Sequence, residues 1–266
     1  MTDNRATSAA DYTLFDIPLP NDPRLPVTGA VTGFANVNPN RFGLVDNYVT
    51  LASNYGRQTE RWNGFDVTMN ARLSKVALQG GLSTGRTSRD DCEVRAKIPE
   101  LPVPASGLQT GPPAGAMPLQ YCKLTEPFQT QLKFLGAYTV PRVDVQIAAT
   151  IENIPGQDIQ AIWAAPNAAL APLLGRNLSG GAANLPINLL PPNTHFSDRT
   201  NQVDMRFAKI VRLYGTRSQI ALDLFNALNS NTIQTYNNNY LPTGAWRTPN
   251  GVLPPRVVRI SGQIDF

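Results

Sequence analysis

The only histidine of the chain, His195, lies two residues before Ser197 and three before Asp198. A histidine, a serine and a carboxylate are the components of a nucleophilic triad, but a triad is assembled from residues on different elements. Three neighbours within one loop, without a strand–turn–helix context, do not fit that arrangement. We therefore expect a solvated or loop-packing histidine here, no catalytic residue, and a protein that is not an enzyme.

An acidic cluster and two glycine-rich stretches are the other candidates for chemistry. Asp90, Asp91 and Glu93 could ligate calcium through their carboxylates, although a solvated acidic turn is the commoner origin of such a cluster. One histidine and no Cys-x-x-Cys pair leave no zinc site. The glycine-rich residues 79–81 and 179–181 lack the Gly-Lys-Ser/Thr of a phosphate-binding loop. We expect no metal and no cofactor.

Polar and aromatic side chains gather in the segment 237–246. Asparagines at 237–239 precede Tyr240, and Trp246 follows closely. Such a group could contact a sugar, but a polar loop tip is the simpler interpretation.

Two cysteines, Cys92 and Cys122, bracket a long segment rich in proline, glycine and alanine. Both lie just outside expected strands. One pair of cysteines in a chain of this type indicates a disulfide formed in an oxidising compartment, with two free thiols as the alternative. Closing a loop of about 30 residues would stabilise the fold by about 3–4 kcal/mol in the chain-entropy model.

The secondary structure of the chain is predicted most clearly at its C-terminus. Residues 256–266 read Arg-Val-Val-Arg-Ile-Ser-Gly-Gln-Ile-Asp-Phe. A period of two, with one apolar and one polar face, indicates a β-strand between unlike media. The apolar face consists of Val258, Ile260, Gly262, Ile264 and Phe266. An edge strand of a soluble sandwich is the alternative for this segment alone.

Six further segments alternate in the same way, at residues 65–73, 76–82, 132–140, 143–151, 203–207 and 220–224. Lys209 breaks the apolar parity of its strand, which requires either a β-bulge or a lysine that snorkels towards water. Tight connections at 74–75, 141–142 and 215–217 alternate with long irregular ones at about 90–125, 155–199 and 232–254. Short periplasmic turns and long extracellular loops are typical of outer-membrane barrels. We therefore predict an all-β fold, an antiparallel up-and-down transmembrane β-barrel segment of about seven strands.

Composition agrees with this interpretation. The hydrophobic content of 42% and the charged content of 16% are low for a packed globule. No run approaches 18 apolar residues, which excludes a transmembrane helix. A spread net charge of +4, without a basic cluster, gives little support to nucleic acid binding, and we expect no nucleic acid partner. The opening residues after Met1 have neither the basic nor the apolar region of a signal peptide.

Three blocks resemble one known family. The first is Trp-Asn-Gly-Phe-Asp-Val-Thr-Met-Asn-Ala-Arg-Leu at 62–73, which continues to Leu-Gln-Gly-Gly-Leu-Ser-Thr-Gly-Arg-Thr at 78–87. The second is Phe-Leu-Gly-Ala-Tyr-Thr-Val-Pro-Arg-Val-Asp-Val-Gln at 134–146. The third is Val-Asp-Met-Arg-Phe-Ala-Lys at 203–209, followed by Leu-Asp-Leu-Phe-Asn-Ala-Leu-Asn-Ser-Asn-Thr at 222–232, and the loop at 173–181 adds Leu-Leu-Gly-Arg-Asn-Leu-Ser-Gly-Gly. Together with the terminal strand they resemble TonB-dependent outer-membrane receptors of the branch with a carboxypeptidase-regulatory-like domain. That family has a 22-stranded barrel, an N-terminal plug and a TonB box.

The resemblance implies a location in the bacterial outer membrane and several partners: membrane lipid, the barrel assembly machinery, the remainder of the chain's own barrel and plug, TonB, and an unknown solute ligand. The barrel-assembly signal would comprise Ile260, Gly262, Ile264 and Phe266. Residues 1–57 would be an extracellular-loop-like segment and 58–266 the C-terminal strands of an incomplete barrel, with Met1 an internal codon or a fragment boundary. The candidates for the lumen-facing surface are Asp66, Arg72, Asp144, Gln146, Asp204, Arg206 and Asp223.

Two other functions fit the same pattern. A structural or adhesive outer-membrane barrel would have the strands and loops but no active transport. A secreted soluble β protein, for example a polysaccharide-acting enzyme, would require a pair of catalytic carboxylates that the sequence does not supply.

Overall fold

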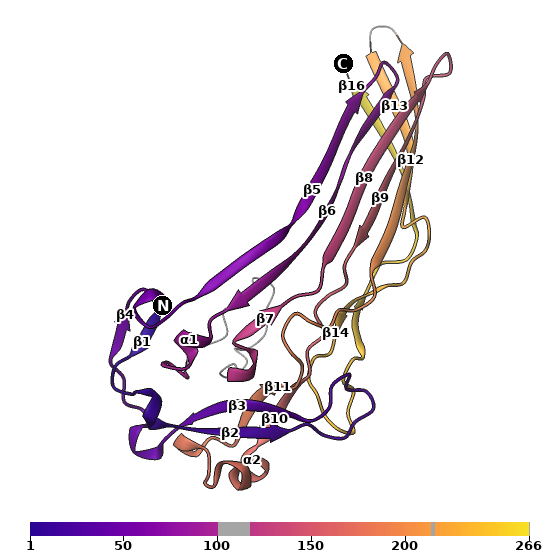
Figure 1. Cartoon of the computed structure of the whole chain (residues 1–266). Coiled ribbons are helices and arrows are strands. Elements are labelled where there is room, and N and C mark those ends of the chain that lie inside the picture. Colours follow the sequence, from indigo (N-terminus) through magenta and orange to yellow (C-terminus); the bar gives the residue numbers. More distant parts are fainter. Residues whose placement is uncertain (101–117, 214–215, 266) are drawn as a thin grey trace.

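The computed structural model describes residues 1–100, 118–213 and 216–265. About 51% of the chain is strand and 11% is helix, and the sheets are antiparallel, so the predicted all-β class is confirmed. The molecule is elongated, with a long twisted sheet at one end and a group of short elements at the other (Figure 1). We call the second part the cap.

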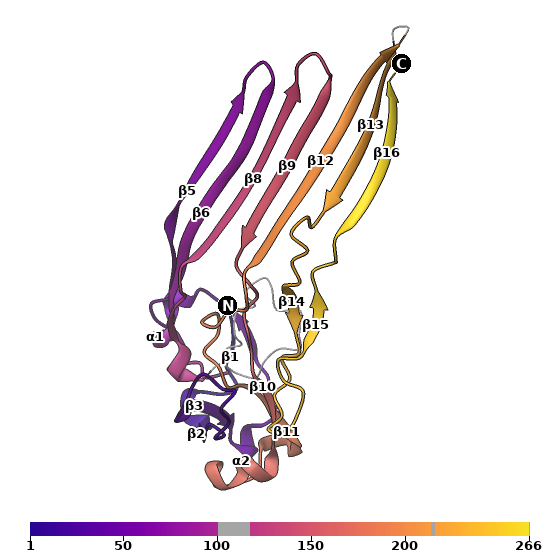
Figure 2. The same cartoon turned by 90° about the vertical axis from the view of Figure 1, so that its right-hand side faces the viewer.

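Seven strands of the long sheet follow one another as a meander (Figure 2). They are β5 (Thr59–Arg72), β6 (Val76–Asp90), β8 (Gln129–Val140), β9 (Val145–Ile154), β12 (Thr200–Leu213), β13 (Thr216–Phe225) and β16 (Val257–Asp265). The short β7 (Lys123–Thr125) pairs with the cap end of β6. All seven segments predicted from the alternation are strands. The described strands do not close into a barrel, because β5 and β16 each pair with a single neighbour along this path.

The register runs without interruption across the central strands. Lys209 pairs directly with Val145 on β9 and with Ile220 on β13, so no bulge corrects its parity. Its ammonium instead donates a hydrogen bond to the carbonyl of Val143 at the end of the sheet. Of the two alternatives for this lysine, the structure contains the snorkelling side chain.

Short turns connect the strands at the end of the sheet away from the cap. The turn between β8 and β9 occupies residues 141–144, and Arg142 and Asp144 have positive φ angles of 71° and 48°. The expected strand at 143–151 therefore begins two residues later, at Val145. Asp144 lies in the turn rather than on the strand, because left-handed backbone ends regular pairing.

The cap is formed by segments that the sequence suggested were irregular. Its strands pair as β1 with β4, β2 with β3, β10 with β11 and β14 with β15. Their bounds are β1 (Thr2–Asn4), β2 (Tyr12–Pro18), β3 (Ala30–Val37), β4 (Asn47–Val49), β10 (Ile162–Pro166), β11 (Asn184–Asn188), β14 (Ile233–Tyr236) and β15 (Pro249–Val252). The helices are α1 (Cys92–Arg95) and α2 (Asn167–Leu174), with 3-10 turns η1 (Ala9–Asp11), η2 (Pro39–Arg41), η3 (Ala52–Asn54), η4 (Leu119–Tyr121) and η5 (Ser179–Gly181).

These elements share the main hydrophobic core of the molecule. Side chains from residues 1–57 pack against side chains from the later loops, and the core includes Phe15, Ile17, Val31, Phe34, Leu170, Ile187, Leu189, Leu190, Tyr240 and Trp246. Burial of this many large apolar side chains stabilises a folded unit, since each contributes about 1.5–3 kcal/mol when fully buried. The expectation of long irregular loops is therefore wrong for these parts of the chain, and residues 1–57 belong to the cap.

Candidate functional site

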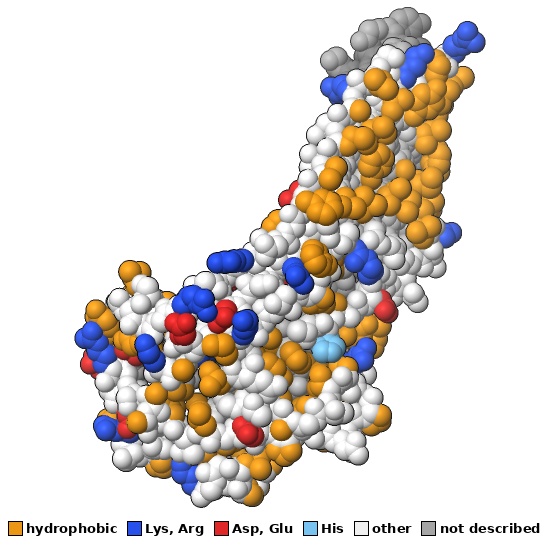
Figure 3. Space-filling view, in the orientation of Figure 1, with side chains coloured by type: hydrophobic (Ala, Val, Ile, Leu, Met, Phe, Trp, Pro, Cys, Tyr) orange, Lys and Arg blue, Asp and Glu red, His pale blue; other side chains and the backbone are white. Residues whose placement is uncertain are grey.

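One face of the sheet is apolar and open. Alternation along each strand places apolar residues of all seven meander strands on the same side, which we call the apolar face. Large side chains on it are between 37% and 76% exposed: Phe65, Val67, Met69, Leu132, Tyr138, Ile147, Ile151, Phe207, Ile220, Leu222, Val258, Ile260 and Ile264. Hydrophobic side chains gather over the sheet in Figure 3. No described element covers this face, whereas the largest apolar patch of a soluble monomer is usually only a few hundred Å².

The opposite face, which we call the polar face, contains a row of paired residues that crosses every strand of the meander. From β16 to β5 the row reads Arg259, Asp223, Arg206, Ala148, Ala137, Ala77 and Arg72. Charged residues therefore occupy both ends of the row, and alanines occupy the middle. Because alanine side chains are short, the middle of this row has neither a charge nor a long side chain.

Asp223 is the centre of an ion-pair cluster at one end of that row. Its side chain is 5% exposed, and its two oxygens form ion pairs with guanidinium groups on both neighbouring strands. Arg206 Nη1 lies 3.3 Å from Oδ1, and Arg259 Nη2 lies 2.9 Å from Oδ2. An ion pair from Arg206 and charge-assisted hydrogen bonds from Arg259 connect the three strands on this face.

The predicted lumen-facing residues are distributed over the polar face and one turn. Arg206 and Asp223 are in contact. Asp204 accepts from Gln202 and from the main-chain N–H of Asn226, both through Oδ1, at 2.9 and 2.8 Å. Gln146 lies on the neighbouring β9, and the exposed Asp66 and Arg72 lie on the far strand β5. Asp144 lies in the 141–144 turn. Arg259 was not among these candidates, although its position directly opposite Asp223 follows from the alternation of the last strand.

The predicted disulfide is present. Cys92 and Cys122 are bonded, with their Cα atoms 4.8 Å apart, and close a loop with a sequence separation of 30. The bond fixes α1 to the end of η4, beside the buried Asp91. Asp91 pairs with Arg95 at 3.0 Å and with Arg89 at 3.2 Å. Burial lowers the pKa of the Arg95 guanidinium from its ordinary value, and the Asp91 carboxylate opposes that shift.

The acidic cluster at 90–93 is neutralised by cations. Asp90 lies within 3.6 Å of Lys123 and 3.9 Å of Arg57, and Arg57 also pairs with Glu93. Each of these carboxylates therefore faces a basic group. Calcium prefers carboxylate oxygens that are not already paired with a cation, so this cluster does not resemble a calcium site. Within the described ranges, no group of three or more potential ligands is arranged to hold a metal ion.

Hydrogen bonds hold the loop that contains the single histidine in place. His195 Nδ1 lies 2.8 Å from the hydroxyl of the adjacent Thr194, and its carbonyl accepts from Ile159 N–H. Ser197 Oγ accepts from the main chain of Gln157. These contacts hold the loop against the segment between β9 and β10.

A buried carboxyl lies beside this loop. Burial raises the pKa of Asp158 to about 6, and its only described side-chain donor is Gln160 Nε2, 3.3 Å from Oδ2. Its other oxygen, Oδ1, has no hydrogen-bond partner among the described residues. Desolvation therefore favours the protonated form of this carboxyl.

Another contact in the cap joins the loop between β2 and β3 to the loop between β14 and β15. Arg24 pairs with Asp22 at 2.6 Å and donates to the carbonyls of Leu241, Pro242 and Gly244. Hydrogen bonds from Arg24 lower the pKa of the Asp22 carboxyl below its ordinary value. The sequence contained no local signal for this contact, because its partners are more than 200 residues apart.

Two aromatic residues of the segment 237–246 belong to the core beneath Arg24. Tyr240 and Trp246 are only 1% and 4% exposed, and their rings pack edge to face at 5.4 Å. Burial raises the pKa of the Tyr240 hydroxyl to about 12. These rings are not available to stack on a sugar, so the bound-sugar interpretation of this segment is wrong for both.

The last strand carries three residues of the expected barrel-assembly signal. Ile260, Gly262 and Ile264 occupy alternate positions of β16 on the apolar face, and the two isoleucines are 76% and 60% exposed. Phe266 lies outside the described residues.

No protein-family model, curated protein or solved structure gives a significant match to this chain. Among the described residues, no helix combines the length and the hydropathy needed to cross a membrane.

Proposed function

We propose that the long sheet is part of the transmembrane barrel of a bacterial outer-membrane receptor that depends on TonB and imports a large or scarce solute. The observation that carries the proposal is the continuous apolar face on seven antiparallel strands, opposite a face with paired charges. Lipid covers the apolar face, and the polar face lines the lumen.

The free energy of exposing the apolar face to water supports lipid as its cover. Thirteen large apolar side chains on it are roughly half exposed, and burying one completely is worth about 1.5–3 kcal/mol. Half of that value for each residue gives on the order of 10 kcal/mol for the face. This is comparable with the whole stability of a typical domain, about 5–15 kcal/mol.

The height of the apolar face also fits a bilayer. On β12 the apolar positions extend from Val203 to Val211. Tilted strands of about 9–11 residues cross an outer membrane. The described tight turns, between β5 and β6 and between β8 and β9, are at one end of the sheet and the cap segments are at the other (Figure 1), the asymmetry of periplasmic turns and extracellular loops.

The edges of the sheet indicate what else the barrel contains. β5 and β16 both run from the cap towards the turns, so they are parallel to each other. Further strands, which pair antiparallel with each edge, complete the barrel, since lipid does not tolerate unpaired backbone groups. In this arrangement Arg206, Asp223 and Arg259 face the lumen or a plug.

The cap would make the first contact with a solute. It is a folded unit of considerable size, tied by the Cys92–Cys122 disulfide and by Arg24. A rigid extracellular surface positions binding groups without a large loss of conformational entropy. Specific TonB-dependent transport is inferred from the three sequence blocks described above.

Membrane location is tested by fractionation of bacteria that express the chain behind an export signal. We expect recovery in the outer-membrane fraction, resistance to alkaline carbonate, and extraction by dodecyl maltoside. Recovery as a soluble periplasmic protein would overturn the proposal.

TonB dependence is tested on the gene. Genomic DNA upstream of the Met1 codon is expected to continue in phase through further alternating strands, a plug and a TonB box. In-frame stop codons directly upstream would contradict a TonB-dependent receptor and leave an outer-membrane barrel of another kind.

A further inference from the structure

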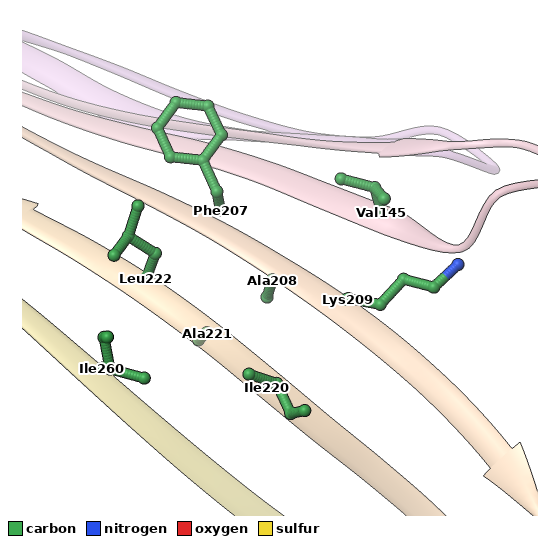
Figure 4. Close-up of a pocket in the computed structure, with 8 residues that line it drawn as sticks. All are labelled: Val145, Phe207, Ala208, Lys209, Ile220, Ala221, Leu222 and Ile260. Atoms are coloured by element: carbon green, nitrogen blue, oxygen red, sulfur yellow. The ribbon is translucent and has the colours of Figure 1, made fainter.

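A hollow of about 340 Å³ lies on the apolar face near the turn end of the sheet. Its walls are Phe207, Leu222, Ile220, Ile260 and Val145, from four strands (Figure 4). The main chain of Ala208 and Ala221 forms its floor, since their side chains alternate to the polar face. An open apolar hollow of this kind provides a surface against which hydrocarbon packs.

One cation borders this hollow. Lys209 extends along it with its ammonium towards the turn end, where it donates to the carbonyl of Val143 (Figure 4). An ammonium has three donors, so two remain for another acceptor. No carboxylate within the described part of the chain forms an ion pair with Lys209. It interrupts a band of apolar residues, with Phe207 on one side along β12 and Val211 on the other.

We propose that Lys209 and this hollow bind an anionic phospholipid, with the phosphate at the ammonium and an acyl chain in the hollow. This inference rests on the proposed membrane location of the sheet. The ammonium of Lys209 lies at the proposed membrane interface, where it would bind the lipid headgroup. The apolar hollow lies within the membrane, where it would bind an acyl chain of the same lipid. Neither a soluble anion nor a hydrocarbon alone matches both.

Charge complementarity specifies the headgroup. A lysine at the membrane surface that forms no ion pair with a described residue favours anionic over zwitterionic lipid. The turn end of the sheet faces the periplasm in the proposed orientation, so the lipid belongs to the periplasmic leaflet. The site would hold this part of the barrel at a fixed depth in the membrane.

The experiment uses the full chain purified from outer membranes in dodecyl maltoside. Native mass spectrometry measures the retention of phosphatidylglycerol and of phosphatidylcholine with identical acyl chains. We expect about fivefold greater retention of phosphatidylglycerol by the wild type. Lys209→Met should abolish this preference, and Lys209→Arg should preserve it.

Lys75 provides the matched control, since it is an exposed lysine in the turn between β5 and β6 at the same end of the sheet, outside the hollow. Lys75→Met should behave as the wild type. An unchanged preference in Lys209→Met, or an equal loss in Lys75→Met, would overturn the lipid site while leaving the membrane location intact. A chain that does not enter the membrane at all would overturn both proposals.

Discussion

Replacement of Asp223 by alanine perturbs the ion-pair cluster of the polar face. The substitution removes the carboxylate that Arg206 and Arg259 share and leaves two guanidinium groups facing each other across β13. Breaking a fully buried ion pair costs about 3–5 kcal/mol. Arg206 and Arg259 are 37% and 58% exposed, so solvent compensates part of their charge. We therefore expect Asp223→Ala to lower the free energy of unfolding by about 2–3 kcal/mol.

The assay is equilibrium unfolding by urea in phospholipid vesicles, followed by tryptophan fluorescence. Asp66→Ala is the matched control, because Asp66 lies exposed on the polar face of β5 and should cost less than about 0.5 kcal/mol. Removing Arg259 as well should recover part of the loss, since one of the two unpaired charges is then absent. A loss for Asp223→Ala no larger than that for Asp66→Ala would refute the assignment of Asp223 as the electrostatic centre of this face.

Three further predictions concern the cap. Replacing Cys92 and Cys122 by serine should destabilise it by about 3–4 kcal/mol, measured as faster limited proteolysis and a lower urea midpoint. Asp158 has a folded pKa of about 6, above its ordinary value of 3.8, so the folded state binds the proton more tightly. Cap stability should therefore fall by on the order of 2 kcal/mol as the pH rises from about 4 to beyond 6, and Asp158→Asn should remove this dependence in urea titrations. Trp246→Ala should cost about 3–5 kcal/mol in calorimetry, because it leaves a cavity beside Tyr240.

Each of these predictions has a clear contrary result. Equal proteolysis rates with and without the disulfide would show that the bond does not constrain the cap. A pH profile that is the same for Asp158→Asn and wild type would assign the pH dependence to another group. A Trp246→Ala variant as stable as Trp62→Ala, which truncates a tryptophan that is 53% exposed, would contradict the role of Trp246 in the core.

The strands of the sheet were predictable because their signal is local. The alternation of apolar and polar residues predicts where each strand lies and on which side of the sheet each of its residues points. The lengths of the turns and loops predict which strands are neighbours. The same signal failed at Val143 and Asp144, where the alternation continues into the turn. Positive φ at Asp144 ends the strand, and the side-chain pattern does not report backbone angles.

The cap was not predictable from local patterns. Its core joins residues such as Phe15, Leu170, Leu189 and Tyr240, which are far apart in sequence and lie in segments rich in proline and glycine. Each segment alone has too few apolar residues to indicate a packed unit. The Cys92–Cys122 pair was the one long-range contact in this region that composition could indicate, and it is present. Arg259 was predictable in principle, since aligning the last two strands by their alternation places it opposite Asp223.

In the proposed membrane location, one face of the sheet contacts lipid and the other contacts water. Single cysteines are placed one at a time at positions Val203 to Lys209 on β12, and each is labelled with a nitroxide. The relaxation of the spin label measures its contact with oxygen, which concentrates in lipid, and with a nickel chelate, which dissolves in water. The native cysteines are bonded to each other and do not react. We expect both accessibilities to alternate with a period of two and out of phase, with oxygen highest at Met205 and Phe207 and nickel highest at Asp204 and Arg206. Equal nickel accessibility at all these positions would show that water reaches both faces, and the sheet would then not lie in a membrane.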